Sequence, residues 1–338
     1  MTITDTERFC SACARQAGLD PAGSAASTYT TVLALELPLP WPYALWGDSG
    51  RVPPEAQALT DHIREEYQRT GTVQLGLIAV APDPDDRPAD RRRLICWQRP
   101  DGPFAQFRRS EYRLSAELLG PLAYALALAP ERLPSFEGYR QEQQDIRDLL
   151  VCTHGSVDAA CGKFGYPAYR HLRGLAAGTD GRVRVWRTSH FGGHVFAPTL
   201  IDMPHGSYWA YIGPEQAAQL LDRSGPASDL RDHYRGWSGA PGPFGQVLER
   251  ELFLRHGWPW LDYAKDGCIT AQEQPDAPER EPRWAEVRME YRAPDGTTGV
   301  ATARIEQADP VEVIHTSGKP DTYPFPQYSV AWLRDEPS

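Results

Sequence analysis

Two cysteines and two histidines stand at positions from which they could share one metal centre. Cys152 and Cys161 are separated by eight residues in "CTHGSVDAAC", and His190 and His194 enclose "FGG" in "SHFGGH". Thiolates and imidazoles are ligands both for zinc and for iron–sulfur clusters. The four side chains form a complete candidate ligand set, provided that the fold brings the two pairs together.

The histidine pair is predicted to lie in a loop. A metalloprotease helix of the H-E-x-x-H type needs a glutamate directly after its first histidine, and Phe191 stands there. Gly192 and Gly193 would each cost about 1 kcal/mol in the interior of a helix. Taken alone, this stretch would be a surface loop with two solvated histidines, so its chemistry depends on the cysteine pair.

The elements expected in residues 146–225 place both pairs at one end of a sheet. They are a buried strand at 147–152, a helix at 162–178, a strand at 182–188, a hairpin formed by 196–203 and 208–213, and a helix at 214–224. This is the thioredoxin-like order, with the second helix replaced by the histidine loop. Cys152 ends the first strand and Cys161 begins the helix, where a helix N-terminus stabilises a thiolate. The loop after the second strand lies at the same end of the sheet, so the four ligands should converge.

The rest of the chain is predicted to form two further domains. Residues 1–145 repeat the same rhythm and are predicted to be a degenerate thioredoxin-like copy, with a strand at 29–37, a helix at 53–71, strands at 73–81, 92–98 and 105–114, and a helix at 115–128. Residues 226–338 are predicted to be β-rich, with a helix at 242–257 and strands at 284–293, 299–306, 310–316 and 328–335. The fold class is therefore α/β, with domains at 1–145, 146–225 and 226–338.

Two cofactors fit the ligand set. Zinc takes two cysteines and two histidines tetrahedrally, but structural zinc sites usually have about two to four residues between their cysteines. A [2Fe–2S] cluster takes two ligands on each iron, and a histidine pair can replace a cysteine pair on one iron. The cluster is longer than a single ion, so widely spaced ligands suit it, and backbone N–H groups could approach its sulfides at Gly155, Gly192 and Gly193. We therefore expect a [2Fe–2S] cluster, with a zinc-stabilised interaction module or a thiol–disulfide oxidoreductase as the alternatives.

The sequence resembles the sucrase/ferredoxin-like family over roughly residues 8–225. The resemblance rests on "CTHGSVDAACGKFGYPAY" and "TSHFGGHVFAPTLIDMPHG", and more weakly on "FCSACARQAGLDPAGSA" and the later "PWP". It implies a thioredoxin-like ferredoxin domain in which H-x-x-x-H replaces the usual second cysteine pair. By position, Cys152 and Cys161 would ligate one iron, and His190 and His194 the other. The implied function is electron transfer with proton-coupled redox chemistry, by a carrier or redox sensor rather than by a catalyst.

The other candidate residues are expected to have no part in the chemistry. Cys10 and Cys13 form a C-x-x-C pair that follows no strand and lacks a second pair at suitable spacing. Cys96 and Cys268 are isolated and are expected to be core thiols. Four polar residues close to the two motifs are expected to be structural or solvated: His154, Lys163, Arg187 and His205.

Composition limits the class of protein. Charged residues make up 24% of the chain and the formal net charge is −10, which argues against a nucleic-acid partner. No apolar run is long enough to span a bilayer, and the N-terminus lacks the pattern of a signal peptide, so we expect a cytoplasmic protein with reduced cysteines. An acidic surface suits docking to a basic patch on a partner. Since no flavin or nicotinamide fingerprint is present, we expect a separate reductase or acceptor protein as the redox partner.

Overall fold

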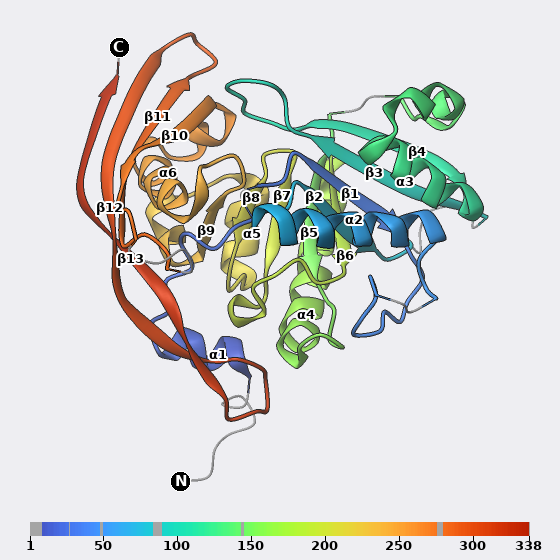
Figure 1. Cartoon of the computed structure of the whole chain (residues 1–338), viewed down its shortest axis with the longest axis horizontal. Coiled ribbons are helices and arrows are strands. Elements are labelled where there is room, and N and C mark those ends of the chain that lie inside the picture. Colours follow the sequence, from blue (N-terminus) through green and yellow to red (C-terminus); the bar gives the residue numbers. More distant parts are fainter. Residues whose placement is uncertain are drawn as a thin grey trace.

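The computed structural model describes residues 9–26, 28–47, 50–83, 90–142, 145–275 and 280–337. Residues 1–8, which carry part of the expectation that no signal peptide is present, lie outside this range. Thirteen strands form a nine-stranded mixed sheet and a four-stranded antiparallel sheet within the described residues (Figure 1). The predicted α/β fold class with a β-rich C-terminal region is confirmed.

The first half of the nine-stranded sheet is built from the elements predicted for residues 29–128. In chain order these are β1 (Thr31–Glu36), α2 (Pro54–Thr70), β2 (Leu75–Val80), β3 (Arg91–Gln98), β4 (Arg108–Ser115), a 3-10 turn at Ala116–Leu118 and α3 (Leu119–Leu128). β1 pairs in parallel with β2 and antiparallel with β3, and β3 pairs antiparallel with β4. The strand order of this half is therefore β2-β1-β3-β4.

The second half repeats this arrangement. Its elements are β5 (Arg147–Cys152), α4 (Ala159–Ala176), β6 (Val183–Thr188), β7 (Leu200–Met203), β8 (Ser207–Trp209) and α5 (Pro214–Asp222). β5 pairs in parallel with β6 and antiparallel with β7, and β7 pairs antiparallel with β8, which gives the order β6-β5-β7-β8. The same order and the same strand directions occur in both halves, as expected for a thioredoxin-like domain and its copy. The halves join where Val80 pairs with Thr188, so the sheet is continuous, and the proposed domain boundaries stay a prediction.

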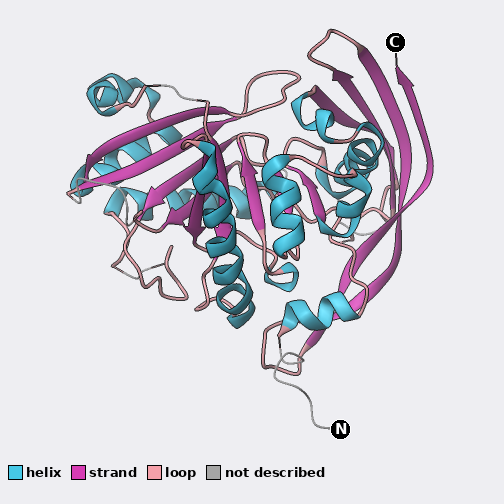
Figure 2. Ribbon diagram, turned by 180° about the vertical axis from the view of Figure 1, so that it is seen from behind, coloured by secondary structure: helices cyan, strands magenta, loops and turns pink. Residues whose placement is uncertain are grey.

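The C-terminal region adds one strand to the first sheet and builds the second. β9 (Tyr234–Trp237) pairs with β8 and is followed by α6 (Gly242–His256). The second sheet then runs β10 (Ala264–Gln272), β11 (Trp284–Arg292), β12 (Thr298–Ile314) and β13 (Thr322–Pro337). Helical segments lie between this sheet and the nine-stranded one (Figure 2).

The sequence patterns missed or divided some of these strands. Neither β9 nor β10 was predicted, and the two strands predicted at 299–306 and 310–316 are one strand, β12. Its pairing with β13 shifts register between Ala308 and Val311, on either side of Pro310. Proline lacks the N–H that a ladder needs, and it is accommodated where a strand is irregular. The pattern therefore predicted a break between two strands at a point where β12 continues and only its pairing with β13 shifts register.

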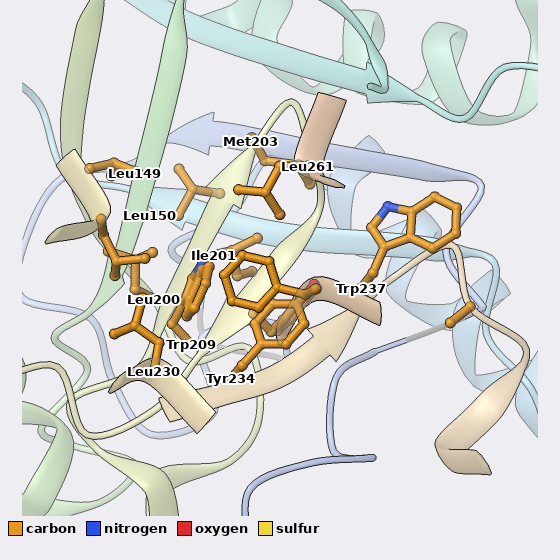
Figure 3. Close-up of a cluster of buried hydrophobic side chains, with 14 of the residues drawn as sticks. Leu149, Leu150, Leu200, Ile201, Met203, Trp209, Leu230, Tyr234, Trp237 and Leu261 are labelled. Carbon is orange, nitrogen blue, oxygen red and sulfur yellow. The ribbon is translucent and has the colours of Figure 1, made fainter. Parts of the chain in front are cut away.

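Aromatic and aliphatic side chains fix the strands of the second half. Trp209, Tyr234 and Trp237 are at most 1% exposed and belong to one cluster with the apolar side chains of β5 and β7. Trp209 and Tyr234 lie close to Ile201, and Trp237 lies at one side of the cluster (Figure 3). Burial of each large apolar side chain stabilises the fold by roughly 1.5–3 kcal/mol. This core therefore holds the ends of its strands in place, including the end of β5 that carries Cys152.

An ion-pair network joins the two halves of the sheet. Glu111 of β4 accepts hydrogen bonds from Arg93 at 2.8 Å, from Arg109 at 2.7 Å and from Arg184 of β6 at 2.8 Å. Arg109 also bonds to the buried carboxylate of Asp148 on β5 at 2.7 Å. Burial would raise the pKa of Glu111, but the neighbouring arginines outweigh it and lower that pKa to about 2.

Replacing Glu111 with glutamine should therefore destabilise the protein at neutral pH. We expect a loss of roughly 3–5 kcal/mol in the free energy of unfolding, because buried guanidinium groups lose their counter-charge. The pKa of the Glu111 carboxyl is lower in the folded protein than its ordinary value of 4.5. The ionised carboxylate therefore stabilises the fold at pH values above 4.5, and this stabilisation is lost as the pH falls toward 2. Denaturant unfolding at several pH values should show the wild-type and E111Q curves converging in acid, and a constant difference would contradict this account.

The N-terminal helix and the C-terminal hairpin meet beside the second half of the sheet. The β12–β13 hairpin extends past the body of the molecule, and its end lies next to α1 (Cys10–Gln16) (Figure 1). The backbone N–H of Cys10 donates to the Ser317 hydroxyl at 3.0 Å. Phe325 of the hairpin packs edge-on against Phe196, with ring centroids 5.2 Å apart. Residues far apart in the sequence thus surround the loop that carries the histidines.

Candidate metal centre

The cysteine and histidine motifs meet because β5 and β6 are neighbouring parallel strands. Cys152, the last residue of β5, pairs with Thr188, the last residue of β6. The histidine loop starts at Ser189, whose N–H donates to the carbonyl of Ala79 at 2.8 Å and whose hydroxyl accepts from the N–H of Ala79 at 2.9 Å. His190 is therefore held beside Cys152.

Three of the four predicted ligands form a compact group. Nδ1 of His190 lies 3.7 Å from Sγ of Cys152 and 3.9 Å from Sγ of Cys161. Cys161 is the third residue of α4, and both cysteines are 1% exposed. These ligand atoms all lie within 4.8 Å of one another, a spacing at which they could hold a metal ion.

The fourth predicted ligand, His194, begins a 3-10 turn at His194–Phe196 and contacts a different pair of residues. Its Nδ1 lies 3.3 Å from Sγ of Cys10 and 3.7 Å from the carboxylate of Asp158. Together these three side chains form a second group with metal-ligand spacing. The rings of His190 and His194 are 5.8 Å apart between centroids, so the two groups adjoin.

Cys10 and Asp158 were therefore missed as neighbours of the centre. Asp158 has a local signal, because it caps the N-terminus of α4 by accepting from the N–H of Ala160 at 2.8 Å. Cys10 has no such signal, since it precedes His194 by 184 positions. The sequence pattern around it indicates only a C-x-x-C pair.

The pKa values of the two cysteine thiols in the first group are shifted in opposite directions. A hydrogen bond from Cys161 lowers the pKa of Cys152 well below the usual thiol value, and His190 lowers it further. Donating that bond raises the pKa of Cys161. The lowered pKa of Cys152 favours its thiolate and the raised pKa of Cys161 favours its thiol, so binding a metal through both sulfurs would release a proton.

At two points near the centre, a glycine lets the backbone approach a neighbouring group closely. A Cβ at Gly165 in α4 would lie 1.9 Å from the carbonyl oxygen of Cys152, so only glycine lets the helix pack on the end of β5. Gly193 has φ +79°, and a Cβ there would lie 2.6 Å from the guanidinium group of Arg235. Both contacts fix the ligand-bearing segments.

Arg235 is a buried cation behind the histidine loop. It is 3% exposed, donates to the carbonyl of Gly192 at 3.4 Å, and lies over the ring of Phe196 at 5.1 Å. Burial lowers its pKa to about 10, so it remains charged at neutral pH. Within the described residues no carboxylate pairs with it, and its charge would favour an anionic group at the centre.

His154 is buried directly behind His190 and has a structural role, one of the two roles expected for it. Its Nδ1 accepts from the backbone N–H of His190 at 3.2 Å, so its Nε2 carries the proton that is donated to the carbonyl of Pro42 at 3.0 Å. Trp41 packs edge-on against the imidazole, with ring centroids 5.7 Å apart. The "PWP" segment of the first half thereby supports a loop of the second.

The other singled-out residues lie outside the centre. His205 bonds to Asp262 at 3.2 Å and to Arg223 at 2.9 Å, whereas Arg187 stacks on Tyr166 at 4.8 Å. Lys163 is exposed on α4. Cys96 is a core thiol, as predicted, and is fully buried.

The prediction for Cys268 is wrong. This residue is exposed on β10, which lies at one edge of the second sheet. Side chains of a strand alternate between its two faces, and Cys268 falls on the face turned away from the core.

The fold and this geometry define an α/β protein with cysteine and histidine groups that could bind metal. The chain belongs to the sucrase/ferredoxin-like family, whose sequence model matches residues 24–236. It is also 30% identical over 104 residues to "Altered inheritance of mitochondria protein 32" of Meyerozyma guilliermondii, a match that covers 28% of this chain and 37% of that protein. The chain thus spans well under half of that relative. No solved structure matches the chain significantly.

Among the described residues, none of the helices is both long enough and apolar enough to cross a bilayer.

Proposed function

We propose that the chain is an electron-transfer protein that holds one [2Fe–2S] cluster through Cys152, Cys161, His190 and His194. The observation that carries this proposal is the convergence of both cysteine sulfurs on His190, within 3.9 Å, with His194 on the same loop. The donor set, two thiolates and two imidazoles, suits a cluster with a cysteine pair on one iron and a histidine pair on the other. When bound, the cluster accepts and returns one electron.

Several polar side chains near Cys152 and the histidine loop favour the binding of an anionic group that carries sulfide. The hydroxyls of Thr153 and Thr188, next to Cys152 in sequence or in strand register, are buried without a hydrogen-bond partner among the described residues. Such donors could be satisfied by sulfide acceptors. Arg235 places an uncompensated positive charge behind the loop. Hydrogen bonds and charge around a cluster set its reduction potential.

Zinc is the second candidate, because His190 is close to both cysteines at once. The distances of 3.7 and 3.9 Å are slightly longer than the spacing of about 3.5–3.6 Å between sulfur and nitrogen ligands of a single tetrahedral zinc ion, so small side-chain adjustments would let one ion contact all three ligands. A zinc-stabilised interaction module would use the same residues. Thiol–disulfide exchange is less well supported, because attack on a protein disulfide needs an accessible thiolate and both cysteines are 1% exposed.

Iron and acid-labile sulfide in the anaerobically purified protein test this proposal. We expect the protein to be brown and to contain about two irons and two sulfides per chain. Zinc at one equivalent, with no sulfide and no visible absorption, would instead establish the zinc module. A control preparation of the C268S variant should match the wild type, since Cys268 is exposed and far along the chain from the centre.

The electron donor or acceptor would be a separate protein. We propose that it presents a basic surface, since this chain carries a formal net charge of −10. A cytoplasmic location belongs to the same proposal, because reduced cysteines are needed to hold the cluster.

A further inference from the structure

We propose that Cys10, Asp158 and His194 form a second metal site, which takes a single divalent ion of the zinc class. The three residues come from α1, from the N-cap of α4 and from the turn after the histidine loop. Nothing in the ligand set of the proposed cluster uses Cys10 or Asp158. The site would tie the N-terminal helix to the thioredoxin-like half.

The ligand atoms have the spacing of a tetrahedral site. With zinc about 2.3 Å from sulfur and about 2.0–2.2 Å from nitrogen or oxygen, tetrahedral angles place neighbouring ligand atoms about 3.3–3.6 Å apart. Sγ of Cys10 lies 3.3 Å from Nδ1 of His194 and 3.5 Å from Oδ1 of Asp158. Nδ1 of His194 lies 3.7 Å from Oδ2 of Asp158. One ion could therefore contact all three with small side-chain adjustments.

The carboxylate is held in place by donors behind it. Asp158 accepts from the Ala160 N–H at 2.8 Å, from the Ser317 N–H at 2.9 Å and from the Ser317 hydroxyl at 2.6 Å. Ligating carboxylates in metal sites are themselves hydrogen-bonded in this way, which fixes their orientation. Ser317 belongs to the connection between β12 and β13, so the C-terminal sheet contributes to the support of the site.

The donor types select the ion. A thiolate, an imidazole and a carboxylate together suit zinc, whereas calcium and magnesium take oxygen ligands and rarely accept sulfur. Cys10 is fully buried and Asp158 is 3% exposed, but the His194 side chain is 22% exposed. The fourth coordination position would therefore open on the side of His194 and could hold water.

Capping alone does not account for this arrangement. The cap of α4 needs only the Asp158 carboxylate and the Ala160 N–H. It requires neither a buried thiol nor an imidazole at ligand distance from the same carboxylate. A metal site uses all three.

Cobalt binding to the full chain, freed of iron and zinc under reducing conditions, tests the second site. We expect the wild type to bind two equivalents of Co²⁺ with tetrahedral absorption bands, one at each group of ligands. The C10S variant should bind one equivalent. A C152S/C161S double variant should also bind one, with the thiolate-to-cobalt absorption of a single sulfur.

Two further variants separate loss of a ligand from loss of the fold. C10H keeps a ligand at this position and should bind two equivalents with weaker thiolate absorption. C13S alters the same helix and should behave as the wild type. A single equivalent in the wild type, or an unchanged stoichiometry in C10S, would overturn the site.

This inference does not depend on the proposed cluster except through the shared residue His194, which would bind the single ion through Nδ1 and the cluster through its other ring nitrogen, Nε2. The cobalt titration uses protein without iron, so it can succeed even if the purified protein holds no iron or sulfide. Conversely, iron and sulfide at full stoichiometry with only one cobalt site would leave the cluster standing and remove the second site.

Discussion

Replacing Cys152 or Cys161 with alanine is expected to abolish binding of the proposed cluster. Each substitution leaves one iron with an empty coordination position, and the neighbouring side chains cannot fill it. Iron and sulfide should fall to less than about a tenth of the wild-type content, because ligand loss removes the free energy that holds the cofactor. The visible absorption should disappear with them.

Histidine variants should behave differently. H190C or H194C can still hold iron, since a thiolate can replace an imidazole as a ligand. Their reduction potentials should be lower than that of the wild type, because a thiolate adds negative charge and opposes the entry of an electron. The C96A variant controls for loss of a buried thiol elsewhere, as Cys96 is fully buried in the first half of the sheet. Full iron and sulfide in C152A or C161A, or an unchanged potential in H190C and H194C, would contradict the proposed ligand set.

The meeting of Cys152, Cys161 and His190 could be predicted from the sequence because it depends on local patterns and one rule of topology. Short apolar runs indicated β5 and β6, and parallel neighbours end at the same edge of a sheet. The register of Cys152 with Thr188 then leaves His190 only two residues from the paired strand end. Errors of a few residues at helix ends, as for α4, did not alter this result.

Contacts made by tertiary packing could not be predicted. Cys10 reaches His194 because α1 and the β12–β13 hairpin both pack against the turn after the histidine loop, and no local pattern encodes this. Arg235 lies on β9, a strand of four residues that is too short to give a periodic signal. The sequence does carry one signal of such a contact. Gly165 lies inside a predicted helix, where a glycine costs about 1 kcal/mol, and this indicates that another segment approaches the helix closely at that position.

The reduction potential of the proposed cluster should depend on pH. An imidazole that binds iron through one nitrogen keeps a second nitrogen that can carry a proton. An added electron makes the centre more negative and raises the proton affinity of that outer nitrogen. Where the reduced protein binds one more proton than the oxidised protein, the potential should fall by about 59 mV for each pH unit.

In protein whose second site holds no ion, the surroundings of His194 allow this coupling; an ion bound through Nδ1 of His194 would leave His190 as the histidine with an exchangeable proton. Burial lowers the pKa of His194, and the nearby carboxylate of Asp158 partly offsets this effect. Burial thus favours the neutral imidazole that ligation needs, and the Asp158 carboxylate could accept a hydrogen bond from the outer nitrogen when that nitrogen carries a proton. The side chain is 22% exposed, so protons can exchange with solvent.

The sign and the range of the effect follow from the two proton affinities. Below the pKa of the outer nitrogen in the oxidised state, both states carry the proton and the potential should be level. Above the pKa in the reduced state, neither carries it and the potential should be level again. Between the two values the potential falls as pH rises.

A voltammetric or spectroscopic titration from neutral to alkaline pH measures this slope. The matched control is the H190C/H194C double variant, whose cysteine ligands carry no second protonatable nitrogen, and its potential should not follow the same slope. A level potential for the wild type over the whole range would mean that the histidines are not ligands or that their outer nitrogens are closed to protons. The potential of the double variant distinguishes the two explanations, because it should be lower than that of the wild type if the histidines are ligands and unchanged if they are not.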